Sequence, residues 1–313
     1  MAIGTVRVCA PAKLNLNLSV LARRDDGFHD IDSVMARLTL ADELTLCERR
    51  GEEDRLERQA SDGDPWLDAA PLPVDGSNLV LRATDAYRAA ARERGVPVPP
   101  LAWRLLKRVP VAAGLGGGSS DAAAALDLLA RRYPAGVELP ALAARLGSDV
   151  PFFLLRSVAA RARGRGEVLE AARVPASPLV LVNPGVPVQA ADAYRWWRPA
   201  GRAAGAAGRE TKGRGAGPTE PAELLPVGAA WWSGPRVHNE LQAGVAAHVP
   251  EVAATLAALG EAWDGPLAMS GSGATCFALA PDRAAAEGLA RRLGERLPKA
   301  WIRVSALAAE TLD

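Results

Sequence analysis

The residues best suited to chemistry stand in one glycine-rich stretch, residues 110–121 (PVAAGLGGGSSD). Its glycines let the backbone approach a ligand closely and adopt positive φ. Alanines and leucines follow at once, so we expect a helix to begin here, with Ser119 or Ser120 as its N-cap and Asp121 in the first turn. A helix start offers free N–H groups and a positive dipole end, so the stretch predicts a phosphate site; the alternative is a flexible turn before a capped helix. The residues of the predicted site are Gly114, Leu115, Gly116, Gly117, Gly118, Ser119 and Ser120.

Familiar phosphate-loop patterns do not fit this stretch. The P-loop ends in Gly-Lys-Ser/Thr, and no lysine follows these glycines. The dinucleotide fingerprint needs a third glycine where Ser119 stands, and the catalytic-loop and Asp-Phe-Gly motifs of protein kinases are missing. The stretch therefore predicts a phosphate loop of another kind.

A second group of polar residues alternates with leucines along residues 5–21. Lys13, Asn15, Asn17 and Ser19 would project from one face of a strand, while the leucines project from the other. Asparagine is depleted in strands, so a row of this kind is better placed lining a cleft than facing water. The alternative is a solvated strand face.

Two further motifs carry residues that packing explains poorly. Asp149 lies in residues 148–153 (SDVPFF), between a helix-ending glycine and an apolar segment that we expect to be a strand; the alternative is an exposed turn aspartate. Residues 269–275 (MSGSGAT) form a second Gly/Ser loop before an apolar strand, a weak signal when taken alone.

Taken together, these motifs resemble the three motifs of the GHMP kinases, a family of small-molecule kinases. The first is similar to residues 11–18 (PAKLNLNL), the second to residues 110–121 and the third to residues 269–275. Residues 24–29 (RDDGFH) resemble the members whose acceptor carries a cytidyl group. The resemblance implies ATP as co-substrate, Mg²⁺ with Ser119 or Ser120 as its contact, and a small-molecule acceptor.

The resemblance also implies roles for single residues. Lys13 and Asp149 would be catalytic. Asn78 would lie by the adenine, with a plain helix N-cap as the alternative, and Lys107 would lie near the nucleotide, with a solvated lysine as the alternative. The residues expected to bind the acceptor are Asn15, Phe28, His29, Tyr194, Gly271 and Ser272.

Two other functions remain open on the sequence. One is a kinase of the same family for another alcohol, such as homoserine or mevalonate. The other is a non-catalytic nucleotide-binding protein on the same fold, since fold alone does not give function.

The elements that position these residues indicate an α+β chain. Helices are expected over residues 77–95, 139–146, 239–259 and 282–297, and strands over residues 5–21, 31–40, 158–172, 178–183, 274–280 and 301–307. Turns are expected at residues 25–27, between the first two strands, and at residues 163–166. The resemblance implies two domains: an N-terminal ribosomal-protein-like α/β domain (1–157) and a C-terminal ferredoxin-like α+β domain (158–313). Residues 199–229 are rich in glycine and alanine and are expected to be a flexible surface insertion.

The amino-acid composition limits the classes of partner that we expect for this chain. The chain has 313 residues with 37 lysines and arginines against 36 aspartates and glutamates, so it has no basic excess for nucleic acid. No apolar run approaches the length of a membrane span, and the first residues lack a signal-peptide pattern. The three cysteines are scattered, without disulfide or metal spacing. We therefore expect a cytoplasmic protein with reduced thiols.

Overall fold

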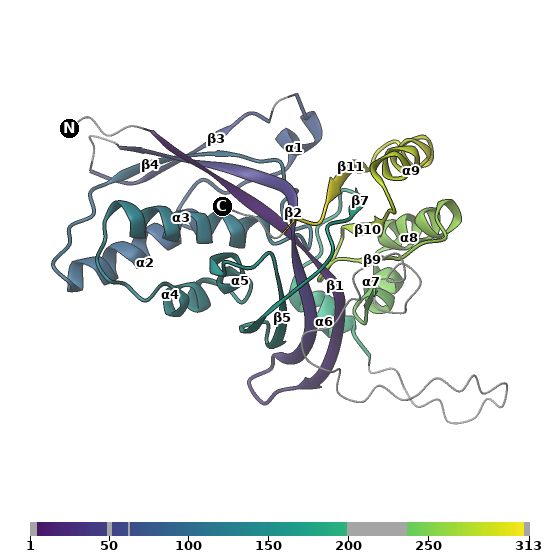
Figure 1. The fold of residues 1–313 in the computed structure, drawn as a ribbon, viewed down its shortest axis with the longest axis horizontal. Helices are drawn as coiled ribbons and strands as arrows, with labels where there is room; N and C mark the ends of the chain where they lie inside the picture. Colours follow the sequence, from purple (N-terminus) through teal and green to yellow (C-terminus); the bar gives the residue numbers. More distant parts are fainter. Residues whose placement is uncertain (1–4, 49–51, 62, 199–236, 310–313) are drawn as a thin grey trace.

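The computed structural model describes residues 5–48, 52–61, 63–198 and 237–309 (Figure 1). They form two β-sheets with helices packed against each sheet. The flexible insertion expected at residues 199–229 lies outside the described residues.

The larger sheet is built around a long antiparallel hairpin. Its strands β1 and β2 are joined by the predicted turn, in which Gly27 has φ +85°. The order is β3-β4-β2-β1-β8, and β5 also pairs with β2 and carries β6 at its edge. The strands are β1 (Val6–Arg23), β2 (His29–Glu48), β3 (Arg55–Gln59), β4 (Leu101–Leu106), β5 (Ala159–Gly164), β6 (Val168–Ala172) and β8 (His238–Asn239).

Helices α2 to α5 lie together beside this sheet (Figure 1). Their apolar faces share a buried cluster with Trp103 of β4 and Leu44 of β2, which explains why amphipathic segments become helices here. The helices of this half are α1 (Pro65–Ala69), α2 (Leu79–Glu93), α3 (Gly117–Arg132), α4 (Leu139–Leu146) and α5 (Val150–Leu154).

Helix α3 begins earlier than the sequence indicates. The predicted N-cap, Ser119 or Ser120, is wrong: the cap is Gly116, in the left-handed region at φ +67° and without a side-chain cap bond. A left-handed backbone suits glycine, so the turn is completed before the serines, which fall inside the first turn of the helix.

The strand expected after Asp149 is also wrong, because residues 150–154 form the short helix α5. Pro151 stands in its first turn, where a missing N–H costs nothing. Phe152 and Phe153 are buried against the larger helices, so one helical turn hides both rings.

The smaller sheet is antiparallel, in the order β11-β7-β10-β9. Its first strand along the chain, β7, lies between β11 and β10, and helices connect the strands as in a βαββαβ unit, which confirms the ferredoxin-like layer. The elements are β7 (Pro178–Asn183), α6 (Ala190–Trp196), α7 (Gln242–His248), α8 (Pro250–Ala262), β9 (Leu267–Met269), β10 (Cys276–Leu279), α9 (Arg283–Arg296) and β11 (Trp301–Ala306).

The single helix expected at residues 239–259 is two helices, α7 and α8, bent by 120°. Pro250 begins α8, because proline cannot donate a hydrogen bond to the preceding turn and ends the helix before it. No single helix in the described ranges is long and apolar enough to cross a membrane. Strand β9 is too short to have been predicted.

The two sheets share one buried cluster. Leu14 and Leu16 of β1 pack there with Leu181 of β7 and Phe277 of β10. The chain passes from the larger sheet to the smaller one between β6 and β7 and returns to the larger sheet only for β8, while the domain boundary at residue 157/158 stays a prediction. The opposite face of β1, which carries the polar row, is therefore fixed between the two halves of the fold.

Candidate active site

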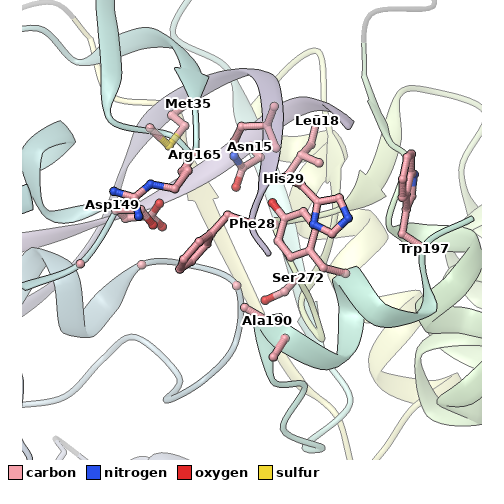
Figure 2. Close-up of a pocket in the computed structure, with 18 of the residues that line it drawn as sticks. Asn15, Leu18, Phe28, His29, Met35, Asp149, Arg165, Ala190, Trp197 and Ser272 are labelled. Carbon is pink, nitrogen blue, oxygen red and sulfur yellow. The ribbon is translucent and has the colours of Figure 1, made fainter. Parts of the chain in front are cut away.

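A cavity of about 1090 Å³ opens at this junction (Figure 2). Its walls come from β1 and β2, the glycine loop before α3, the segment before α5, helix α6 and the loop before β10. The structure thus brings together residues from all three predicted motifs. The predicted site residues on its walls are Lys13, Asn15, Phe28, His29, Gly114, Gly116, Asp149, Tyr194, Gly271 and Ser272.

The predicted catalytic pair lies in this cavity. Lys13 Nζ stands 3.4 Å from Asp149 Oδ2; the lysine side chain is 5% exposed and the aspartate side chain 31%. A buried ammonium is stable only with partners, and Asp149 supplies an opposite charge. The open carboxylate oxygens can meet a hydroxyl group, while the lysine stays behind them as a fixed positive charge.

Asn15 fixes the lysine from the other side. Lys13 Nζ donates to Asn15 Oδ1 at 2.5 Å, and Asn15 Nδ2 donates to Ser33 Oγ at 2.8 Å. Ser33 Oγ in turn donates to the carbonyl of Asn17 at 2.6 Å. This chain of bonds sets the asparagine amide. Lys13 and Asn15 of the predicted polar row are therefore buried at the cavity, whereas Asn17 and Ser19 are half-buried and are not among the residues that line it.

The glycine loop lies directly against β1. The N–H of Lys13 donates to the carbonyl of Leu115 at 2.9 Å, while the Leu115 side chain is buried in the core. A Cβ on Gly116 would lie 3.0 Å from Lys13 Cγ, and a Cβ on Gly114 would lie 2.2 Å from the carbonyl oxygen of Ser270. Close approach on both sides therefore requires glycine at these two positions.

The third motif closes over this loop. Ser270 Oγ donates to the carbonyl of Gly114 at 3.0 Å and accepts from the N–H of Asn15 at 3.3 Å. The N–H of Thr275 donates to the carbonyl of Ala113 at 3.2 Å. One buried serine thus joins all three motifs, although the sequence singled out its neighbours Gly271 and Ser272.

The rest of the phosphate loop lies at the start of α3. Gly118 is exposed, Ser119 is half-buried and Ser120 is buried, and Gly117 packs beneath them. A Cβ on Gly118 would lie 3.7 Å from Leu79 Cδ1, which puts the head of α2 next to the loop. The backbone N–H groups of this first turn have no helical acceptor, so they can hold phosphate oxygens.

The far end of the cavity is aromatic. The rings of His29 and Tyr194 stack with centroids 5.1 Å apart and planes inclined by 16°, and Trp197 meets His29 edge-on at 5.6 Å. Phe28 is 54% exposed, with Arg165 Cζ 4.9 Å from its ring centre. In Figure 2, Arg165 and Asp149 lie on one side of Phe28, and His29 and Trp197 on the other.

Burial governs the titration of this aromatic group. It lowers the pKa of His29, with a smaller contribution from the charge of Arg23. Burial, together with the charge of Asp149, raises the pKa of Tyr194 to about 12. At neutral pH both rings are therefore uncharged.

Asn78 caps helix α2, which is the alternative role that the sequence offered for this residue. Its Oδ1 accepts from the N–H of Val80 at 2.9 Å, and its Nδ2 donates to the carbonyl of Pro73 at 2.7 Å. A contact with adenine stays a prediction for this residue.

Lys107 is buried, so the solvated alternative is wrong. Its Nζ pairs with Asp42 and lies 3.0 Å from Asp121 Oδ2. Burial by itself lowers the lysine pKa, but the two carboxylates together raise it; burial raises the pKa of Asp121 to about 7 against the opposing charge of Lys107. Asp42 also accepts from the N–H groups of Arg108 and Val109, so this cluster anchors the chain leading into the glycine loop.

Sequence reasoning missed several residues of the cavity. Arg165 lies in a tight turn between β5 and β6, and its sequence indicated only that turn. Trp197 directly follows α6, and no motif marks it. The other arginines on the walls are Arg23, Arg195 and Arg198.

Comparison with known proteins agrees with this geometry. The model of the GHMP kinases N-terminal domain matches residues 78–157, and that of the GHMP kinases C-terminal domain matches residues 227–299. A 4-diphosphocytidyl-2-C-methyl-D-erythritol kinase of Deinococcus radiodurans is 45% identical over 298 residues, 94% of this chain and 90% of that protein. A protein of the same name from Anaeromyxobacter dehalogenans is 41% identical over 310 residues, 97% of this chain and 90% of that protein.

Solved structures give the same result. A crystal structure of 4-(cytidine 5'-diphospho)-2C-methyl-D-erythritol kinase matches with a TM-score of 0.75 at 34% identity, over 97% of this chain and 100% of that one. A homoserine kinase of Cytophaga hutchinsonii matches with a TM-score of 0.61 at 16% identity, over 97% of this chain and 95% of that one, and so shares the fold. Since the relatives match along nearly their whole length, the chain belongs to the GHMP kinase family, in its group of 4-diphosphocytidyl-2-C-methyl-D-erythritol kinases.

Proposed function

We propose that the chain transfers the γ-phosphate of ATP to the 2-hydroxyl of 4-diphosphocytidyl-2-C-methyl-D-erythritol, in non-mevalonate isoprenoid precursor biosynthesis. One observation carries the proposal: a single cavity joins the glycine loop before α3 and a Lys–Asp pair to a group of stacked aromatic rings. Phosphoryl transfer asks the protein mainly for positioning and charge stabilisation, and this cavity offers both.

The pair divides the chemistry between its members. Asp149 accepts the hydrogen bond of the acceptor hydroxyl, orients it and takes its proton as the bond to phosphorus forms. Lys13 holds its positive charge next to the transferring group, where negative charge develops. The first turn of α3, with Ser119 and Ser120, binds the ATP phosphates through its N–H groups.

The acceptor lies across the cavity with its base at the aromatic end. Its cytosine stacks within the group of Phe28, His29 and Tyr194, and its hydroxyl lies at Asp149. Its diphosphate then passes Arg165, which lies on the Asp149 side of Phe28 with its Cζ 4.9 Å from the ring centre. An arginine fork suits phosphate oxygens, and its guanidinium covers the exposed face of Phe28.

A Mg²⁺ ion at the loop would take most of its ligands from the nucleotide and few from the protein. No cluster of three or more His, Cys, Asp or Glu side chains in the described ranges could hold a metal ion. Mg²⁺ with ATP needs only one or two protein oxygens besides phosphates and waters. Ser120 Oγ is buried and lacks a hydrogen-bond partner among the described residues, so Ser120, with Ser119 beside it, would hold the ion. The ion would neutralise charge on the phosphates.

The direct test is an acceptor panel. ADP release is measured with ATP and one acceptor at a time: 4-diphosphocytidyl-2-C-methyl-D-erythritol, homoserine or mevalonate. We expect turnover with the cytidyl acceptor to exceed that with the others by at least about 10³-fold in kcat/KM, because the aromatic end would stay empty with either of them. Equal turnover of homoserine or mevalonate would refute the acceptor, and binding of ATP without any turnover would favour a non-catalytic protein.

A further inference from the structure

The aromatic end of the cavity depends on one short helix. Helix α6 carries Tyr194, and Trp197 follows as its C-cap residue; both rings contact His29. Seven residues make a helix too short to be stable alone, so its place must come from contacts with other elements.

Helix α7 supplies these contacts at the end of α6. A Cβ on Gly244 of α7 would lie 2.7 Å from the carbonyl oxygen of Trp196 and 2.9 Å from its carbonyl carbon. One turn later, the ring of His248 stacks on the ring of Trp196, with centroids 4.7 Å apart and planes inclined by 5°. The two helices therefore pack closely at Gly244, which has no side chain, and at the stacked rings of His248 and Trp196.

Helix α7 is itself fixed to the reaction end of the cavity. Gln242 accepts a hydrogen bond from the N–H of Met269 at 2.9 Å through its Oε1. Just before the helix, Asn239 Oδ1 accepts from the N–H of Leu241 at 2.9 Å, and its Nδ2 donates to the carbonyl of Gly271 at 2.7 Å. Gly271 lines the cavity beside Lys13, so α7 connects the third motif to the aromatic end.

We propose that α7 positions the base-recognition wall: Gly244 and His248 hold the end of α6 so that Tyr194 and Trp197 stay against His29, at the end of the cavity where the cytosine of the acceptor binds. Neither Gly244 nor His248 touches the cavity, so both are positioning residues. The inference rests on the proposed function, because it assumes that the acceptor carries this base.

A matched pair of glycine variants tests the proposal. Gly244→Ala places a methyl group against the backbone of Trp196, whereas Gly260→Ala, in α8, meets nothing within 4 Å. Both replace a helical glycine with alanine, so both gain the same helix propensity. We expect Gly244→Ala to raise KM for the cytidyl acceptor about tenfold, as for a lost base stack, with kcat and KM for ATP within about twofold of wild type. Gly260→Ala should match the wild type in all three.

The histidine gives an independent pair. His248→Ala removes the ring that stacks on Trp196 and should also raise KM for the acceptor. His248→Phe keeps a flat ring at this position and should keep KM for the acceptor near the wild-type value. If Gly244→Ala fails to fold, this pair decides the proposal by itself.

Calorimetric titration with CDP separates this inference from the proposed function, because it needs no turnover. CDP should bind about tenfold more weakly to Gly244→Ala than to wild type or Gly260→Ala. Unchanged CDP affinity and acceptor KM in Gly244→Ala, or an equal rise in both KM values, would overturn the role of α7. Absence of turnover in the wild type, with CDP binding still dependent on Gly244, would overturn the proposed reaction and leave the role of α7 standing.

Discussion

The side chain of Lys13 is almost fully buried, whereas the side chain of Asp149 is partly exposed. This difference is the basis of the roles that we propose for the two residues. The buried lysine cannot leave its partners Asn15 and Asp149, whereas the aspartate is open enough to meet an acceptor. In the proposed reaction the lysine is therefore the fixed charge, and the aspartate is the group that meets the acceptor hydroxyl.

Removal of either charge should slow the transfer step. We expect Asp149→Asn and Lys13→Ala to lower kcat by about 10²-fold or more, with KM for ATP nearly unchanged, because in the proposed site the nucleotide binds at the start of α3. Initial-rate kinetics with both substrates measure this. Asp127→Asn, which removes a surface carboxylate paired with Arg131, is the matched control and should behave as wild type. Turnover near wild type in Asp149→Asn would refute its role.

The aromatic residues should affect only the acceptor. Phe28→Ala and His29→Ala each remove a ring from the far end of the cavity, so we expect acceptor KM to rise about tenfold or more with KM for ATP unchanged. Steady-state kinetics with one substrate varied at a time measure both values. Equal effects on the two substrates would show a general loss of structure and would reopen the choice of acceptor.

Single residues differ in how far the sequence predicted them. Alternation along β1 identified Lys13 and Asn15, because a strand fixes which side chains share a face. Arg165 and Trp197 had no such signal: one depends on a turn between two strands and the other on where a short helix ends. Their places depend on tertiary packing, which no local pattern encodes.

At the scale of elements, the errors have local physical causes. Because serine is a common cap, the sequence predicts the start of α3 at the serines, but the left-handed Gly116 ends the loop sooner. The sequence predicts a strand where α5 forms, because the apolar run there is too short to show a period. Pro250 divides what looked like one helix into α7 and α8. In each case a glycine, a proline or the burial of two rings outweighed the average secondary-structure preference of the segment.

Lys107 should stabilise the connection between β4 and α3. Lys107→Met would leave Asp42 and Asp121 as buried carboxylates without their cation, so we expect a loss of about 3–5 kcal/mol in the free energy of unfolding. Urea denaturation measures this. Lys299→Met, on the exposed segment before β11, is the control and should change stability little. A stable Lys107→Met variant with a higher KM for ATP would instead indicate that the lysine serves the nucleotide.

At the scale of the whole molecule, the site exists because two sheets meet along β1. One face of β1 packs into the shared core with β7 and β10, and the other carries Lys13 and Asn15 into the cavity. The half of the fold around the first sheet brings the glycine loop and Lys13, and the half around the second brings α6 with its aromatic residues. The resemblance of the motifs to a family indicated that both halves of the fold contribute to one site. Composition and periodicity alone indicated only an α+β fold.

The most direct test of the proposed reaction is to identify its product. The wild-type protein is incubated with ATP and 4-diphosphocytidyl-2-C-methyl-D-erythritol, and the mixture is followed by phosphorus NMR. We expect one new phosphomonoester signal, on the 2-hydroxyl of the cytidyl acceptor, to grow in step with ADP. ADP formed without a phosphorylated acceptor, or phosphate found at another hydroxyl, would contradict the proposed reaction.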